Sequence, residues 1–305
     1  MNDRNSLPIN LKKGEIFAVQ KIMEFQLCKF SKEDIEGLVN LSASVGWDYD
    51  DDEIHTVLSV GTIYGHKTAQ GEIISSAAII PYEHTLASIG MVIVKEHYRG
   101  YRLGKELTQA CINSVHHNVP IMLIATEAGY HLYEKLGFQT VTTVHKLLSN
   151  QDLLLQNQQN DNYEVCPLSD HHFPHIHNLD QNAVGADRVQ FLKARMKQAK
   201  QGVVIKGKNG KIIGFGLSIE GPVNLILGPI VALNDDIAIC IIHHLAKEYK
   251  GKLRIDVPDG KNSFVTYLEQ CGFIKVSQPP VMIKNSATLP LRNHSLYGIA
   301  AQIFG

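Results

Sequence analysis

The sequence predicts an α/β (α+β) protein that contains two related units in tandem. Strand-like apolar runs alternate with segments of helical spacing along the 305 residues. The stretch SNQDLLLQNQQNDN is rich in Asn and Gln and divides the chain nearly in half. YLEQCGF at 267–273 echoes LYEKLGF at 132–138, and each follows a strand-like run. The expected organisation is a first domain at 1–148 with its core at about 23–148, a linker at 149–162 and a second domain at 163–305.

The first half contains short apolar runs separated by turn residues and by segments of helical spacing. Ser31 is placed to cap the first helix, and the acidic run DYDDDE suits the positive end of the second. An amine or metal site is the alternative reading of DYDDDE. Strands are expected at 23–29, 60–67, 72–81, 85–95, 121–125 and 137–148, and helices at 31–43, 50–58, 101–116 and 127–136.

The second half repeats part of this order. GVVIKGKNGKIIGFGLSIE predicts a hairpin that turns at KNGK, and LILGPIVA predicts the strand before the helix DDIAICIIHHLAKEY. LRIDV and YLEQCGF then predict a strand and a helix. The ending YGIAAQIFG is expected to form one more strand that closes this half.

Composition excludes several classes of function. The net charge is −1, so no chain-wide basic field indicates a nucleic-acid partner. No apolar run approaches the roughly 18 residues of a membrane helix, and the polar start lacks a signal-peptide pattern. The five cysteines form no CxxC pair and are expected to be reduced, buried thiols. We expect a cytoplasmic protein with no nucleic-acid or membrane partner.

The segment YRGYRLGKEL at 98–107 lies between a strand-like run and a helix-like run. A helix N-terminus offers unpaired N–H groups and the positive end of the helix dipole. Gly100 and Gly104 allow a ligand to approach the backbone, while Arg99, Arg102 and Lys105 add charge. The segment therefore predicts a pyrophosphate site, with a solvated surface helix as the alternative.

RGYRLG resembles the Arg/Gln-x-x-Gly-x-Gly/Ala signature of the GNAT superfamily of acyl-CoA-dependent N-acyltransferases, and EAGYHLYEKLGF resembles a characteristic ending of that family. The resemblance extends over residues 23–149 and, more weakly, over 162–285. It implies two tandem GNAT-like domains, each with a mixed, mainly antiparallel twisted sheet flanked by helices. It also implies that the second domain is degenerate.

The resemblance assigns roles to individual residues. Tyr133 matches the general acid that protonates the departing CoA thiolate, since a phenol with a pKa of about 10 stays protonated at neutral pH. Aromatic packing within a helix is its alternative role. Acetyl-CoA is the implied cosubstrate, and the residues implied to bind it are Val92, Ile93, Val94, Arg99, Gly100, Tyr101, Arg102, Leu103, Gly104, Lys105 and Thr126.

Two positions depart from the family pattern. Arg102 stands where the signature usually has Gly, which is harmless only if the backbone there is near helical. Ile121 stands where some relatives place a carboxylate base. The base must then lie elsewhere, and the candidates by position are Glu83, His84, Asp50, Asp51 and Asp52, of which His84 has the most suitable ordinary pKa.

The second half lacks the corresponding features. Asp235 and Asp236 stand where the first half has Arg and Gly, and two carboxylates would repel a pyrophosphate. Leu268 stands at the place of Tyr133, with Tyr267 one residue early. We expect this half to complete the substrate cleft or the interface between the halves.

The histidine cluster HHFPHIH at 171–177 raises the possibility of a metal site. No Cys, Asp or second His pair follows at ligand spacing, and Pro174 interrupts a helix that would align the rings. We expect a polar loop here and no metal.

The sequence thus predicts an N-acetyltransferase that transfers acetyl from acetyl-CoA to a small or peptidyl primary amine by direct attack in a ternary complex. A non-catalytic acyl-CoA-binding or regulatory module, and an acyltransferase that uses another acyl-CoA, are the alternatives. The protein is expected to be a monomer or a homodimer.

Overall fold

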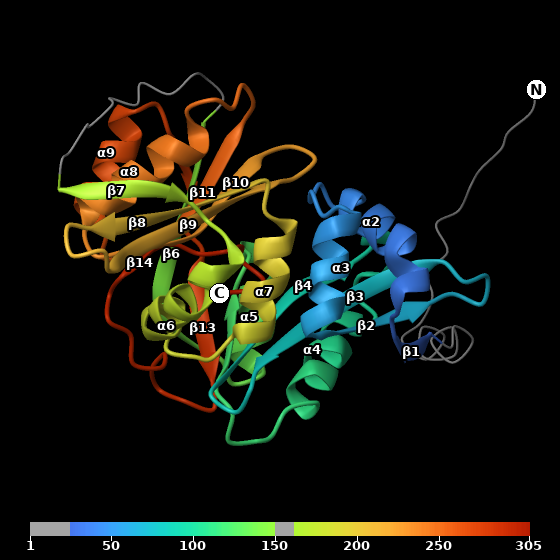
Figure 1. Ribbon diagram of the computed structural model, residues 1–305. Coiled ribbons are helices and arrows are strands. Elements are labelled where there is room, and N and C mark those ends of the chain that lie inside the picture. The colour runs from blue at the N-terminus through green and yellow to red at the C-terminus, as the bar shows by residue number, and fades with distance from the viewer. Residues whose placement is uncertain (1–24, 150–161) are drawn as a thin grey trace, which may run out of the picture.

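The computed structural model describes residues 25–149 and 162–305, as a mixed β-sheet with helices on both faces (Figure 1). The α+β class predicted from the sequence is confirmed. Residues 23 and 24 of the first expected strand, and almost all of the expected linker, lie outside the described residues.

The first half forms its elements close to the predicted places. Asp50 caps α3 by accepting a hydrogen bond from the Glu53 N–H at 2.8 Å, which explains why this helix starts in the acidic run. The elements are β1 (Gln26–Lys29), α2 (Ile35–Ala43), α3 (Asp51–Val60), β2 (Thr62–Lys67), β3 (Ile73–Tyr82), β4 (Leu86–Val94), α4 (Leu103–Asn113), β5 (Ile121–Ile124), α5 (Glu127–Lys135) and β6 (Gln139–Ser149).

The second half contains the predicted hairpin, strand and helices. Its elements are β7 (Tyr163–Pro167), α6 (Phe173–Val184), α7 (Val189–Gln198), β8 (Gln201–Gly207), β9 (Ile212–Glu220), β10 (Leu225–Ala232), α8 (Asp235–Ala246), β11 (Leu253–Pro258), α9 (Asn262–Gln270), β12 (Ile274–Ser277), β13 (Pro280–Lys284) and β14 (Leu296–Gly298). The expectation of a loop over the histidine cluster is wrong, because His171 and His172 lie in the 3₁₀ helix Asp170–His172 and the rest of the cluster begins α6. Pro174 lies in the first turn of α6, where its missing N–H costs no hydrogen bond.

The two halves exchange strands. The sheet runs β1-β2-β3-β4-β5-β13-β6-β11-β10-β9-β8-β7, so β13 from the second half lies between β5 and β6 of the first. The first part of β6 pairs with β13, and its last part, Val144–Ser149, pairs with β11. The predicted domain boundaries stay a prediction, but neither half completes its sheet with its own strands alone.

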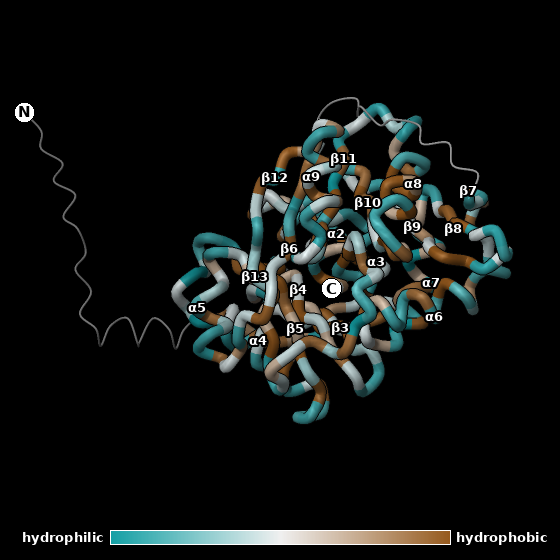
Figure 2. Tube along the Cα trace, turned by 90° about the vertical axis from the view of Figure 1, so that its left-hand side faces the viewer, coloured by the Kyte–Doolittle hydropathy of each residue, from teal (hydrophilic) through white to brown (hydrophobic). Residues whose placement is uncertain are grey.

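The hydrophobic core is continuous between the halves. One cluster joins Leu38 and Ile54 of the first half with Phe191, Phe215 and other buried residues of the second. A smaller cluster on the opposite face of β3 and β4 packs α4 and α5, and it includes Met282 of β13. Figure 2 shows hydrophobic residues along the strands at the centre of the molecule, with polar residues outside.

The final segment of the chain lies between the halves rather than in a closing strand. Only Leu296–Gly298 pair as β14, so the predicted strand over 297–305 is wrong beyond Gly298. Figures 1 and 2 both place the C-terminal end near the centre of the molecule. Backbone carbonyls explain this position, since Phe304 O accepts from the Tyr82 hydroxyl at 2.6 Å and Ala300 O from Arg195 Nη2 at 2.8 Å.

Candidate functional site

Strands β4 and β5 separate part of the way along their length. Their parallel pairing runs from Ala87–Ile121 to Ile89–Leu123 and then ends. Met91 has a positive φ of 51°, and the pairing of β4 with β3 shifts register in the same region. Among the described residues no strand pairs with β4 on the β5 side beyond Ile89, so backbone groups of Gly90–Val94 that face this side have no strand partner, although Val94 O accepts from Arg99 Nε at 3.3 Å.

The segment Arg99–Lys105 turns directly into α4. Gly100 has a φ of 90°, a conformation that glycine adopts without steric cost. Leu103 is buried and anchors the first turn of the helix, whereas Arg99, Arg102 and Lys105 are exposed. The structure therefore combines free first-turn amides with three cationic side chains, while Tyr101 is partly buried against the ring of Phe25.

The replacement of the usual Gly by Arg102 was expected to be harmless only if the backbone there is near helical. It is not. This residue is the N-cap of α4 with φ 64° and ψ 12°, in the left-handed region that favours glycine. Arg102 thus carries backbone strain. Its neighbour Gly104 has ordinary space around it, because an added Cβ would lie 3.5 Å from Leu132 and 3.7 Å from Val94.

Tyr133 lies on the inner face of α5. Its side chain is 6% exposed, packs edge-on to Phe138 and lines a cavity below the gap between β4 and β5. Burial raises the pKa of its phenol well above the ordinary value. Thr126 also lines this cavity, and its hydroxyl caps α5 by accepting from the Gly129 N–H at 3.2 Å.

The cavity is built from both halves of the chain and has a volume of about 160 Å³. The first half contributes β4, β5, β6, α5 and the start of α3 with the segment before it. The second half contributes α7, β9, β10, β11 and the final segment. Its polar lining consists of Asp48, Tyr49, Asp50, Glu53, Thr126, Tyr133, Lys146, Gln198, Glu220, Arg254 and Gln302.

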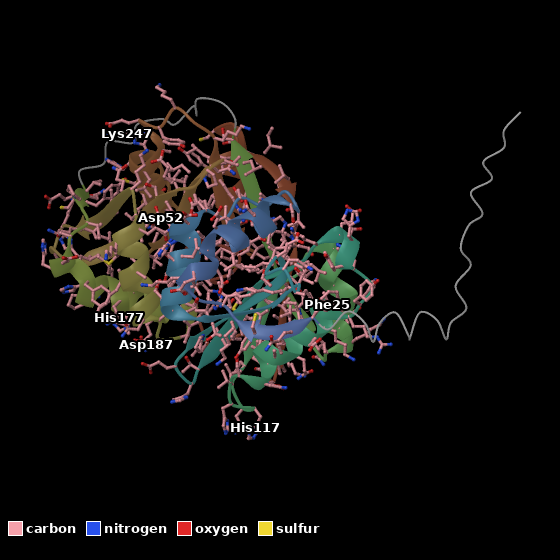
Figure 3. All side chains as sticks on the ribbon, turned by 90° about the vertical axis from the view of Figure 1, so that its right-hand side faces the viewer. Phe25, Asp52, His117, His177, Asp187 and Lys247 are labelled. Atoms are coloured by element: carbon pink, nitrogen blue, oxygen red, sulfur yellow. The ribbon has the colours of Figure 1, made fainter. Side chains whose placement is uncertain are left out.

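Of the five candidate bases, Asp50 is the one that lines the cavity. Burial raises the pKa of its carboxyl, so it is a better proton acceptor than an ordinary aspartate. Asp51 and Asp52 are exposed on α3, where Figure 3 labels Asp52. Glu83 and His84 are exposed in the turn after β3 and line no part of this cavity.

Sequence reasoning missed the cavity residues of the second half and of the centre of β6. Lys146, Arg254 and Gln302 lie far apart in the chain, and no local motif connects them. The available signal was a charge inside an apolar strand run, as in VHKLL and LRIDV. Such a charge within a buried strand indicates a partner or a ligand, because burying it alone is costly.

In the second half, the place that corresponds to the gap between β4 and β5 contains a strand. β10 pairs with β11 only at Leu225 and Ile226, and β14 then pairs with β10 at Ile230 and Val231. Asp235 opens α8 and accepts a hydrogen bond from the Tyr297 hydroxyl at 2.7 Å. Leu268 is buried at the position that corresponds to Tyr133.

The histidine cluster makes contacts of an ordinary structural kind. His177 Nε2 lies 2.9 Å from Asp187 Oδ1, and Figure 3 shows the two side by side. His171 and His172 contact the Ser169 hydroxyl at the start of the helix. Among residues 25–149 and 162–305, no group of three or more His, Cys, Asp or Glu is arranged to hold a metal ion. No helix in the same ranges is both long and apolar enough to cross a membrane.

Comparison with known proteins identifies the family to which the chain belongs. Two profiles, each described as an acetyltransferase (GNAT) domain, match residues 59–140 and 176–298. The chain is 33% identical over 281 residues to YitH of Bacillus subtilis (strain 168), an uncharacterized N-acetyltransferase. That match covers 92% of this chain and 98% of YitH. The chain therefore belongs to the GNAT family of acetyltransferases and carries two GNAT domains in tandem.

Solved structures share the fold over most of its length. A crystal structure of a candidate acetyltransferase from Pyrococcus horikoshii aligns with a TM-score of 0.76 and 19% identity, over 99% of this chain and 100% of that one. A tandem GNAT protein from the clavulanic acid biosynthesis pathway aligns with a TM-score of 0.64 and 11% identity, over 87% of this chain and 100% of that one. At these identities the likeness concerns the fold.

Proposed function

We propose that the protein transfers an acetyl group from acetyl-CoA to a primary amine by direct attack in a ternary complex. One observation carries the proposal: the gap between β4 and β5, the buried Tyr133 and the carboxylate Asp50 all border the same cavity. An acyl donor and an acceptor amine can meet there with acidic and basic groups beside them.

The residues of the first half fit acetyl-CoA. The edge of β4 at Val92, Ile93 and Val94 has no strand partner on the side of the gap, where an extended pantetheine arm could add as a strand does. The first amides of α4, with Arg99, Arg102 and Lys105, suit the pyrophosphate. At Gly104 an added Cβ would meet only ordinary van der Waals contacts, so no other part of the protein presses against the backbone there.

Two side chains are placed to move protons. Asp50 accepts the proton that the amine loses as its nitrogen attacks the thioester carbonyl. Tyr133 donates its phenolic proton to the sulfur of the departing CoA, and its raised pKa keeps it protonated until then. Each transfer of this kind contributes about 10²- to 10⁴-fold to a rate.

The test is release of the free CoA thiol from acetyl-CoA in the presence of a broad panel of amines. The proposal predicts release that depends on both protein and amine. Tight binding of acetyl-CoA without acetylation of any amine would favour a non-catalytic acyl-CoA-binding module. Faster turnover with succinyl-CoA or another thioester would identify a different acyl donor.

Charge reversal at Arg99 tests where the cosubstrate binds. Arg99→Glu should weaken CoA more than a pantetheine fragment that lacks the pyrophosphate, because only CoA carries the charge that Arg99 would meet. Equal losses of affinity for the two ligands would show that the segment Arg99–Lys105 does not bind the pyrophosphate.

A further inference from the structure

One wall of the cavity is formed by residues of four neighbouring strands, which are β9, β10 and β11 of the second half and β6 of the first. Ile219 of β9 pairs with Ile226 of β10, and Ile226 pairs with Arg254 of β11. Lys146 of β6 is paired with Asp256, two residues beyond Arg254 and therefore on the same face. The wall is thus apolar at one end and bears two cations at the other, Lys146 and Arg254, both of which line the cavity.

A hydrogen bond to Asp256 fixes the orientation of the Arg254 guanidinium. Its Nε donates to Asp256 Oδ2 at 2.7 Å, and the other oxygen of Asp256 accepts from Gln302 Nε2 at 3.0 Å. Asp256 is 1% exposed, so both of its oxygens are used in positioning these two donors. Among the described residues no hydrogen bond is formed by the two Nη groups, neither group is fully buried, and Arg254 lines the cavity. This leaves a pair of parallel donors, the arrangement that binds a carboxylate in bidentate fashion.

Lys146 has no ion-pair partner among residues 25–149 and 162–305, although it is half-buried. Burial first, and the like charge of Arg254 second, lower the pKa of its ammonium group. Two neighbouring cations cost free energy unless anions compensate them. Asp256 is ion-paired with Arg254, whereas Lys146 is influenced by the charges of Asp256 and Asp48 without an ion pair to either.

The carboxylates that also line the cavity have partners of their own. Glu53 is bound by Arg195, and Glu220 lies 2.6 Å from Lys200. Asp48 accepts from Asn224 Nδ2 at 3.3 Å. Asp50 is the proton acceptor proposed above. The charge of Asp48 also acts on Lys146 and Arg254, but the Lys146 ammonium group and the two Nη groups of Arg254 have no hydrogen-bond partner among the described residues and can receive an anion.

We propose that Lys146 and Arg254 form a subsite for a carboxylate on the acceptor, so that the acceptor is a small primary amine that also carries a carboxylate, as in an amino acid. This inference rests on the proposed acetyl transfer. The cavity volume of about 160 Å³ favours a small molecule over a folded protein as acceptor.

The test uses the full-length protein and matched pairs of acceptors. Each α- or ω-amino acid is compared with the amine of the same length that lacks the carboxylate, and phosphoethanolamine tests a phosphate in its place. The amino acids should have kcat/KM values about 10- to 100-fold higher than their partners, as expected for a hydrogen-bonded charge pair. Equal values for both members of each pair, or preference for phosphoethanolamine, would overturn the carboxylate assignment.

Two variants locate the effect. Lys146→Met and Arg254→Lys should each raise KM for the preferred amino acid about tenfold or more, and should leave kcat/KM for the matched amine within about twofold. Lys208→Met, in the exposed turn of the β8–β9 hairpin, is the control and should change neither. Equal losses on both acceptors would show a catalytic or folding role instead, and the melting temperature of each variant separates these two.

A direct binding measurement keeps the inference distinguishable from the proposed function. Calorimetry with CoA present measures whether the amino acids bind to wild type and to Lys146→Met. If no amine is acetylated, the proposed function fails, while amino-acid binding that is lost in Lys146→Met still supports the subsite. Binding that is equal in the two proteins would overturn it.

Discussion

In the first half, β4 stops pairing with β5 after Ile89, and in the second half β10 stops pairing with β11 after Ile226. The first gap borders a cavity that is lined by Tyr133. The second gap is filled by β14, which pairs with β10. In the first half the separation leaves the edge of β4 without a strand partner, where we propose that a ligand binds. In the second half the corresponding edge of β10 pairs with β14. Closing the second gap with β14 leads residues 299–305 into the centre, where Ala301, Gln302 and Ile303 become a wall of the first half's cavity.

The first prediction concerns the residue at which the halves differ most. Tyr133→Phe should lower kcat about 10²- to 10⁴-fold, because the general acid is lost, while acetyl-CoA affinity stays nearly unchanged. Tyr267→Phe is the matched control in the second half and should leave kcat unchanged. An unchanged kcat in Tyr133→Phe would show that Tyr133 has a packing role and is not the general acid.

The second prediction concerns pH. The pKa of Asp50 is raised by burial, so its basic form is lost as pH falls through a value above the ordinary 3.8. The plot of kcat/KM against pH should therefore rise through this value, and Asp50→Asn should remove that rise and lower the plateau about 10²-fold or more. An unchanged profile in Asp50→Asn would assign the base to another group.

The third prediction tests the exchange of strands. Met282 belongs to the second half of the sequence, but it is fully buried in the cluster that packs α4 and α5 of the first. Met282→Ala should lower the free energy of unfolding by about 2–5 kcal/mol, measured in denaturant. Unfolding should remain a single transition, since the halves share a core. Two separate transitions would show that the halves fold independently.

How much of this could be predicted from the sequence depended on how local the signal was. The helix that opens in DYDDDE and the place of Tyr133 were predictable, because caps and short motifs lie within a few residues. The exchange of β13 and β6 between the halves was not predictable. The alternation of apolar and polar residues in a strand shows which face is buried, but not which strand pairs with it. The cations Lys146 and Arg254 belong to such strands, so their meeting in one cavity depends on a pairing that no local pattern contains.

The fourth prediction compares two glycines, one beside each gap. At Gly228 an added Cβ would lie 2.1 Å from the backbone oxygen of Ile299, next to β14, so Gly228→Ala should destabilise the protein by about 1–3 kcal/mol. Gly104→Ala meets only ordinary contacts, and it should be neutral or stabilising by up to about 1 kcal/mol. Thermal denaturation of the two variants measures both effects. Equal tolerance would mean that β14 does not lie as closely against β10 as described.

The smallest effect is expected at Arg102. Arg102→Gly relieves a left-handed backbone, and it should change the free energy of unfolding by less than about 1 kcal/mol, in the stabilising direction. The same variant should weaken CoA, because it removes one of the three cations. Tighter CoA binding would show that the guanidinium is not directed at the pyrophosphate.

We propose that the first half of the chain binds acyl-CoA and that the second half helps to build the acceptor cavity. Titration of CoA into the protein by calorimetry tests this proposal. We expect one CoA per chain, with binding weakened by Arg99→Glu and unchanged by Asp235→Asn. Two sites per chain, or one site that depends on Asp235 and not on Arg99, would contradict it.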